Sequence, residues 1–303
     1  MFLVVLFMGP LVAMTQSPDL DFVFRNQIHV VIDGQPSALG RNTLVLFALP
    51  NGNTIPQTMG RRLKPGDDWH FDIQHIKAQS AFIRQESGQH YVIVYLENTY
   101  RSWPRWKQVH EADFREQLKA LVDTIQDVLG LKKFDLHLSA HSGGGSFLFG
   151  LFKAWGSLPP FLSRITFLDS NYGYDSSYLP ILAGWIKNKS HQLTVFAYND
   201  SLVQYNGKPL VSPKGGTWFK SHEMMKDFGY NWRVEKLSDS LDHFQNPAGN
   251  VNFFLINNAA HGILHTVQVE RNGFIHGEMI GTPWENRRYR YFGDRAYTGL
   301  IAE

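Results

Sequence analysis

Ser142 is the residue of this sequence best suited to act as a nucleophile. It stands within Phe134–Gly150, which reads FDLHLSAHSGGGSFLFG. An alternating apolar run precedes it and apolar residues at helical spacing follow it, so the pattern predicts a strand, a tight turn and a helix. A serine hydroxyl held at such a turn can attack a carbonyl group when a base takes its proton.

The positions two before and two after Ser142 are both small, Ala140 and Gly144. Small residues are needed there because the strand and the helix pass close to each other. The N–H of Gly143, at the start of the helix, can then stabilise a developing oxyanion. A phosphate-binding loop is the alternative, but neither GxxxxGK[ST] nor GxGxxG is present. The stretch resembles the nucleophile elbow of the α/β-hydrolase superfamily, with Ala140 in place of the usual first glycine.

The resemblance implies a general base that follows the acid along the chain. Three histidines come after the last apolar strand, in or near HGILHTVQVERNGFIH. His265 is the preferred base, because it lies in a loop-like stretch that leads to an expected helix from Asn272. His261 is the alternative base, and His276 is the third choice because it falls inside that helix.

Two aspartates stand at strand ends and could orient the base. Asp169 follows RITFL, and Asp200 follows QLTVFAYN. The usual superfamily position is the one that Asp200 occupies, and some relatives use the earlier one. We therefore expect Asp200 to be the acid, with Asp169 as the alternative acid. The residue that is not used would cap the neighbouring turn.

A second oxyanion donor is expected in the turn Leu49–Asn53, at the end of the buried strand expected at Thr43–Leu49. Its glycine, Gly52, permits close backbone approach, so the N–H of Asn53 or Gly52 would join that of Gly143. This turn departs from the His-Gly pattern of many lipases. A plain turn without any catalytic role is the alternative.

Two aromatic residues, Trp103 and Tyr172, follow strands at the same expected edge of the sheet and are candidates for substrate binding. Core packing is the alternative for both. Together with the elbow, these residues predict a serine hydrolase that cleaves a small-molecule or polymeric carboxylic ester through an acyl-enzyme on Ser142. An amidase or peptidase with the same triad is the alternative, as is a non-catalytic binding protein on a hydrolase scaffold.

A metal centre is not expected, and no cofactor is implied. The motif HExxH is absent, and His137 and His141 flank a strand rather than a helix turn. The ligand-rich stretch Asp67–His75 is expected to cap a helix instead, since an aspartate at a helix start suits the helix dipole.

Composition excludes several classes of function. The 303 residues carry a formal charge of +2 and no cluster of Lys or Arg, which argues against a nucleic-acid partner. Cysteine is absent, which excludes a thiol nucleophile, disulfides and cysteine-based metal sites. Hydrophobic residues make up 43% of the chain, enough for a substantial core.

The first residues resemble the hydrophobic part of a signal peptide. The stretch MFLVVLFMGPLVAM is apolar and uncharged, but it is short for a transmembrane helix and contains Pro10. We expect residues 1–18 to be a signal peptide, with cleavage between Ala13 and Ser17. The mature chain would then be exported, periplasmic or secreted, without a stable membrane span.

The remaining pattern predicts an α/β fold, a doubly wound and mostly parallel sheet flanked by helices, as in the α/β-hydrolase fold. Residues 19–303 are expected to form a single domain, with 201–250 as a candidate insertion or lid. Expected helices include Phe71–Arg84 and a long one after Pro104. The buried strands are expected at Thr43–Leu49, His90–Leu96, Arg164–Asp169, Gln192–Tyr198 and Val251–Ile256.

A wider resemblance covers most of residues 40–300. The stretches ALPNGNT, GDDWHFDIQH, AHSGGGSF, FLDSNYGYD and ILHTVQVERNGFIH are together similar to a group of bacterial, exported α/β-hydrolase-like proteins. The resemblance implies the fold and the order of the site residues, and it implies no particular substrate.

Overall fold

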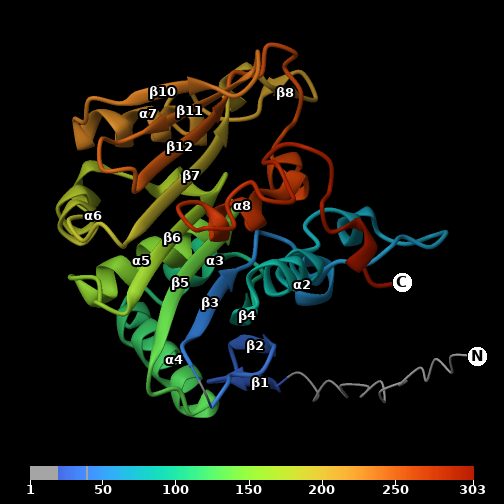
Figure 1. Cartoon of the computed structure of the whole chain (residues 1–303), viewed down its shortest axis with the longest axis vertical. Helices are drawn as coiled ribbons and strands as arrows, with labels where there is room; N and C mark the ends of the chain where they lie inside the picture. Colours follow the sequence, from blue (N-terminus) through green and yellow to red (C-terminus); the bar gives the residue numbers. More distant parts are fainter. Residues whose placement is uncertain (1–19, 39) are drawn as a thin grey trace, which may run out of the picture.

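A ten-stranded sheet runs through the whole molecule, with helices on both of its faces (Figure 1). The computed structural model describes residues 20–38 and 40–303. The strand order is β1-β2-β4-β3-β5-β6-β7-β12-β11-β10. The doubly wound, mostly parallel sheet predicted from the sequence is therefore confirmed.

The six central strands are parallel, and nearly all of their residues are buried. Continuous apolar runs suit such strands because helices cover both of their faces. They are β3 (Asn42–Ala48), β4 (His90–Asn98), β5 (Phe134–His141), β6 (Leu162–Leu168), β7 (Gln192–Tyr198) and β12 (Val251–Ile256).

Antiparallel strands extend the sheet at both ends. At one end lie β1 (Leu20–Phe24) and β2 (Ile28–Asp33). At the other end lie β11 (Leu241–Gln245) and β10 (Arg233–Lys236), which the apolar pattern did not predict. All four residues of β10 are exposed, so this edge strand lacks the apolar signal of a buried one.

Residues 201–250, the candidate insertion or lid, hold several elements. Besides β10 and β11 they contribute a small hairpin of β8 (Gln204–Tyr205) and β9 (Lys208–Pro209), and helix α7 (Thr217–Phe228). Strands β10 and β11 therefore belong to the main sheet. A role of this segment as a lid stays a prediction.

Two apolar clusters fill the space between the sheet and its helices. On one face pack α3 (Trp103–Val109), α4 (Phe114–Leu129), α5 (Gly145–Trp155), α6 (Leu179–Ile186) and α7. On the other lie α1 (Ile55–Met59), α2 (Ile76–Ser87), α8 (Phe274–Met279) and the chain that follows α8. Figure 1 shows α4, α5 and α6 on one side of the sheet and α2 and α8 on the other.

Short helical turns connect several of these elements. Most of them follow a strand or precede a helix, where the chain changes direction. They are η1 (Trp69–Asp72), η2 (Ser142–Gly144), η3 (Asn171–Gly173), η4 (Ser176–Tyr178), η5 (Asp200–Leu202), the π-type turn η6 (Val269–Gly273) and η7 (Thr298–Leu300).

Three helices differ from the expectation. The long one expected after Pro104 is divided into α3 and α4. The one expected over Phe71–Arg84 begins only at Ile76, because His75 has a left-handed backbone with φ +48°. The one expected from Asn272 is short, since Asn272 is also left-handed, with φ +65°. Its side-chain amide donates to two carbonyls of the C-terminal chain, which offsets the cost of that conformation.

The predicted signal peptide, residues 1–18, lies outside the residues that the structure describes. Among residues 20–38 and 40–303, none of the helices combines the length and the apolar character needed to cross a bilayer.

Candidate active site

Ser142 occupies a strained turn at the carboxyl end of the central strand β5. The strand ends at His141, and the turn η2 leads directly into α5. Ser142 has φ +54°, a left-handed conformation that side chains with a Cβ adopt rarely. Backbone strain of this kind persists only where the surrounding structure enforces it, and it concentrates at functional sites.

The glycines after Ser142 allow that turn to fit against its neighbours. A Cβ on Gly144 would collide with the main-chain carbonyl of Ala48, at the end of β3. One on Gly145 would collide with the carbonyl of Ser170, just after β6. The predicted need for a small residue at position 144 thus has a specific cause, the close approach of the turn to the end of β3.

His265 and Asp169 meet beside this turn. The Nδ1 atom of His265 donates a hydrogen bond to the carboxylate of Asp169. Asp169 is fully buried and immediately follows β6, whereas the His265 side chain is 24% exposed, in the loop after β12. With Nδ1 donating, Nε2 is the imidazole atom left to accept a proton.

His141 links the turn to the loop that carries His265. Its Nε2 atom donates to the main-chain carbonyl of His265 over 3.1 Å, and the two ring centroids are 4.6 Å apart. His141 is buried, and burial holds its pKa well below the usual value, with a further contribution from the nearby His265. A neutral imidazole can still donate from Nε2. The loop that carries His265 is therefore hydrogen-bonded to His141, the residue next to Ser142.

Asp200, the acid preferred from the sequence, contacts a different partner. Its carboxylate accepts from the main-chain N–H of Thr217 over 2.8 Å. Within residues 20–38 and 40–303 it has no hydrogen bond to His265 or any other histidine. The structure thus brings the alternative acid, Asp169, to the base. Chain order alone could not separate the two, because both follow neighbouring parallel strands.

Asp200 nevertheless lies close to the pair. Burial raises its pKa to about 6, and the charge of Asp169 adds to this effect. The two carboxylates are joined by Thr217, whose hydroxyl donates to Asp169 and also lies 3.4 Å from Asp200 Oδ2. Sequence reasoning missed Thr217, because a lone threonine at a helix start carries no signal of its distant partners.

The other two candidate bases lie elsewhere. His261 is exposed and left-handed, with φ +56°, and its N–H closes a turn onto the carbonyl of Asn258. His276 is buried in α8. Its Nδ1 atom is 3.0 Å from the hydroxyl of Tyr289, and burial lowers its pKa to about 3. It is therefore a neutral core histidine.

The candidate oxyanion donors differ in availability. Gly52 has φ +85°, but its N–H donates to the carbonyl of Arg101 over 2.8 Å, so it is not free to bind an oxyanion. Asn53 is buried, and its side-chain amide nitrogen has no hydrogen-bond partner in the described chain. The side chain of Asn51 lies against the α-carbon of Gly143, which brings this turn next to the elbow.

The two candidate substrate residues separate. Trp103 is only 1% exposed and packs against Trp106 and Phe147 at centroid distances of 5.6 and 4.6 Å. Its ring is therefore packed in the core beside α5, and a role in substrate binding stays a prediction. Tyr172 is half-buried, and its ring meets that of His265 edge-on at 6.3 Å.

Several residues with the chemistry of metal ligands contact protein partners instead. Among residues 20–38 and 40–303, no three histidine or acidic side chains are grouped as a metal ion would need. His137 lies 2.5 Å from the buried carboxylate of Glu278. Asp68 accepts from the N–H of His70 and so caps η1, a short helical turn rather than the expected helix.

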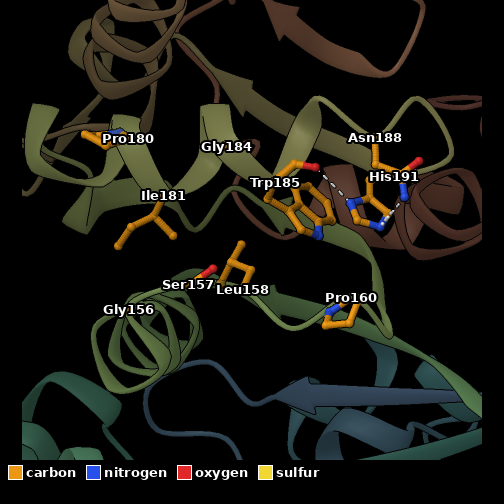
Figure 2. Close-up of a pocket in the computed structure, with 10 residues that line it drawn as sticks. All are labelled: Gly156, Ser157, Leu158, Pro160, Pro180, Ile181, Gly184, Trp185, Asn188 and His191. Carbon is orange, nitrogen blue, oxygen red and sulfur yellow. Dashed lines mark hydrogen bonds between the residues drawn. The ribbon is translucent and has the colours of Figure 1, made fainter.

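A hollow of about 400 Å³ lies between the end of α5 and helix α6 (Figure 2). Its lining residues lead into the amino ends of β6 and β7, at the sheet edge opposite Ser142. The His191 ring in this hollow is held by the Trp185 carbonyl over 2.9 Å and the Asn188 amide over 3.1 Å. This hollow therefore lies apart from the serine turn and its base.

Comparison with known proteins yields matches among solved structures alone. No family model matches the chain, and no curated protein sequence matches it. An acetyl xylan esterase from Aspergillus awamori is 9% identical, with 77% of this chain and 88% of that one covered and a TM-score of 0.44. A siderophore hydrolase from Aspergillus nidulans is 10% identical, with 91% and 99% covered and a TM-score of 0.46.

A third match is an acylaminoacyl peptidase from Pyrococcus horikoshii, 12% identical, with 87% of this chain and 41% of that one covered and a TM-score of 0.42. All three matches have TM-scores below 0.5 and identities of 12% or less. The similarity to a bacterial, exported group stays a prediction. The parallel sheet flanked by helices, with the strained serine turn after β5 and the histidine after β12, is the α/β-hydrolase fold.

Proposed function

We propose that this protein is a serine hydrolase that cleaves a carboxylic ester, with Ser142 as nucleophile, His265 as base and Asp169 as acid. The observation that carries the proposal is the hydrogen bond from His265 Nδ1 to buried Asp169, beside a serine in a strained turn. A nucleophile, a base and an acid that orients the base are the parts that acyl transfer by serine requires.

Each member of the triad has a defined task. His265 takes the Ser142 proton at Nε2 while Ser142 Oγ attacks the ester carbonyl. Asp169 accepts from Nδ1, which fixes the ring and stabilises the imidazolium. The tetrahedral intermediate collapses to an acyl-enzyme as the imidazolium gives its proton to the leaving alcohol. Water, deprotonated by the same nitrogen, then releases the acid product.

The oxyanion would be bound by main-chain N–H groups of Gly143 and Asn53. Gly143 lies at the start of the helical turn that leads into α5, where N–H groups point toward a ligand. The contact of Asn51 with Gly143 supports the pairing of these two turns. Removing one such donor from a serine hydrolase reduces turnover by about 10²- to 10³-fold.

A fluorophosphonate probe tests the nucleophile. Wild-type protein should be labelled, and Ser142→Ala should not. Ser146→Ala is the matched control, since Ser146 lies one turn further along α5 and its hydroxyl makes no hydrogen bond in the described chain. Labelling that persists in Ser142→Ala would overturn the nucleophile. A folded wild type that is never labelled would favour a binding protein on a hydrolase scaffold.

Turnover of p-nitrophenyl acetate tests the base and the acid. His265→Ala and Asp169→Asn should each lower kcat by about 10³-fold or more, because the base is lost or misoriented. His261→Ala should leave kcat unchanged. The reverse ranking of the two histidines would contradict the choice of base. Faster cleavage of a p-nitroanilide than of the ester would favour the amidase alternative.

Export of the chain is a separate proposal, carried by the apolar sequence of residues 1–18. N-terminal sequencing of protein recovered after expression in a bacterial host should give a new start between Ala13 and Ser17. Retention of Met1 on material from the cell interior would contradict it.

A further inference from the structure

Thr217 holds two buried carboxylates at once. Its hydroxyl donates to Oδ1 of Asp169, the oxygen that does not face His265. Its main-chain N–H donates to Asp200 Oδ2 over 2.8 Å. Thr217 and Asp169 are fully buried, and Asp200 is 1% exposed. The arrangement therefore forms one continuous chain from Asp200 through Thr217 and Asp169 to His265.

The position of Asp200 depends on the start of α7. Gly216 precedes that helix, and a Cβ there would collide with the Asp200 carboxylate. The absence of a side chain at 216 thus lets the carboxylate reach the first N–H of α7. The positive end of the helix stabilises a negative charge at this point. The Oδ1 atom of Asp200 is buried without a hydrogen-bond partner in the described chain.

We propose that Asp200 and Thr217 are positioning residues that hold Asp169 in place and make His265 a stronger base. This inference rests on the proposed function, since it concerns the same base. In this proposal neither Asp200 nor Thr217 contacts the reacting atoms. Both act through Asp169, to which the Thr217 hydroxyl is bonded directly.

The electrostatic effect of Asp200 has a definite sign. A second negative charge close to the Asp169–His265 pair stabilises the imidazolium that forms when His265 takes a proton. The ionisable groups that face Asp200 are Asp169, from the end of β6, and the phenols of Tyr172 in η3 and Tyr198 in β7. Both phenols are neutral, because burial raises their pKa above the usual value.

The charge on Asp200 is itself titratable. Burial and the charge of Asp169 bring its pKa to about 6. Above pH 6 Asp200 is charged and supports the base. Below pH 6 a proton on Asp200 removes this support.

The direct test is an NMR titration of His265 in Asp200→Asn, which is isosteric but uncharged. We expect the pKa of His265 to fall by about 0.5 to 1 unit relative to wild type. The acid limb of the fluorophosphonate labelling rate should move to lower pH by the same amount. Asp239→Asn is the control, since Asp239 is exposed and its carboxylate makes no hydrogen bond within the described chain.

Thr217 is tested by a pair of variants. Thr217→Val removes the hydroxyl but keeps the shape and the N–H to Asp200, and it should slow labelling by about tenfold. Thr217→Ser keeps the hydroxyl and should restore the rate to within about threefold of wild type. Both variants should have wild-type circular dichroism, which separates the loss from unfolding.

Two results would overturn the inference. One is a His265 pKa that is the same in Asp200→Asn and wild type. The other is labelling by Thr217→Val at the wild-type rate. The NMR titration needs no turnover, so it remains decisive even if Ser142 is never labelled. Failure of labelling would reject the proposed function, whereas an unchanged titration would reject the role of Asp200.

Discussion

The Nε2 atom of His141 donates a hydrogen bond to the main-chain carbonyl of His265, over 3.1 Å. One residue thus joins the end of β5 to the loop after β12, although 124 positions separate the two in the sequence. The buried ring also packs against the ring of His265. The residue before the serine therefore helps to hold the base loop beside the serine.

Replacing His141 with Phe tests this contact. The new ring keeps the packing but cannot donate, so the His265 loop loses one anchor. We expect kcat/KM for p-nitrophenyl acetate to fall by about tenfold, while the free energy of unfolding changes by about 1 kcal/mol or less. Steady-state kinetics and urea unfolding measure both, and unchanged kinetics would show that packing alone orients the loop.

Glycines in and after the elbow should differ sharply in their tolerance of a methyl group. In Gly144→Ala the new Cβ meets the carbonyl of Ala48, which is part of a central strand and cannot move. The free energy of unfolding should fall by about 3 kcal/mol or more. In Gly150→Ala the Cβ meets side-chain atoms instead of backbone, the ends of Leu118 at 2.8 Å and of Lys107 at 3.3 Å.

Gly150→Ala should therefore cost less, since a flexible leucine can shift and alanine favours the helix. Urea unfolding of the two variants under the same conditions makes the comparison. An equal loss of stability in both would contradict the role given to the strand carbonyl.

Asp200→Asn should make the protein more stable at alkaline pH. The carboxyl has a pKa of about 6 in the folded protein against the ordinary 3.8, so above pH 6 its buried charge disfavours folding. Two pKa units correspond to about 3 kcal/mol, which is the upper limit of the expected gain. As the pH falls from 6 to 4, the folded protein binds the proton first, and the difference between variant and wild type should shrink.

Urea unfolding at pH 8 and at pH 4 measures this convergence. Asp239→Asn, an exposed site, should show no such pH-dependent gain. An Asp200→Asn protein that is less stable than wild type at pH 8 would mean that the buried carboxylate stabilises the fold. A gain in stability together with lower activity would show that Asp200 is retained for function at the expense of stability.

Asn53→Ala tests whether the main-chain N–H or the side-chain amide of Asn53 binds the oxyanion. The proposed oxyanion donor is the main-chain N–H, which the substitution keeps. The side-chain nitrogen has no partner in the described chain, so its loss should cost little stability. We expect kcat within about threefold of wild type. A fall of about 10²-fold would instead assign the oxyanion contact to the side chain.

Local sequence patterns determined the strands and the elbow. The buried runs predicted six central strands because parallel strands covered on both faces need continuous apolar side chains. The small residues around Ser142 predicted the turn for a similar reason, since only small residues fit where a helix crosses strand ends. By contrast, β10 is an exposed edge strand with charged residues, so no apolar pattern announced it.

Tertiary structure alone decided which acid meets the base. Asp169 and Asp200 both end apolar strands, and nothing in their local sequence ranks them. Their strands, β6 and β7, are adjacent in the sheet, so the two aspartates are one strand apart. Only the tertiary contact shows that Asp169 is the one that binds His265. Thr217, the residue that joins the two carboxylates, lies 48 positions from Asp169 and 17 from Asp200. Contacts over such separations depend on how loops pack across the sheet edge, which no local pattern encodes.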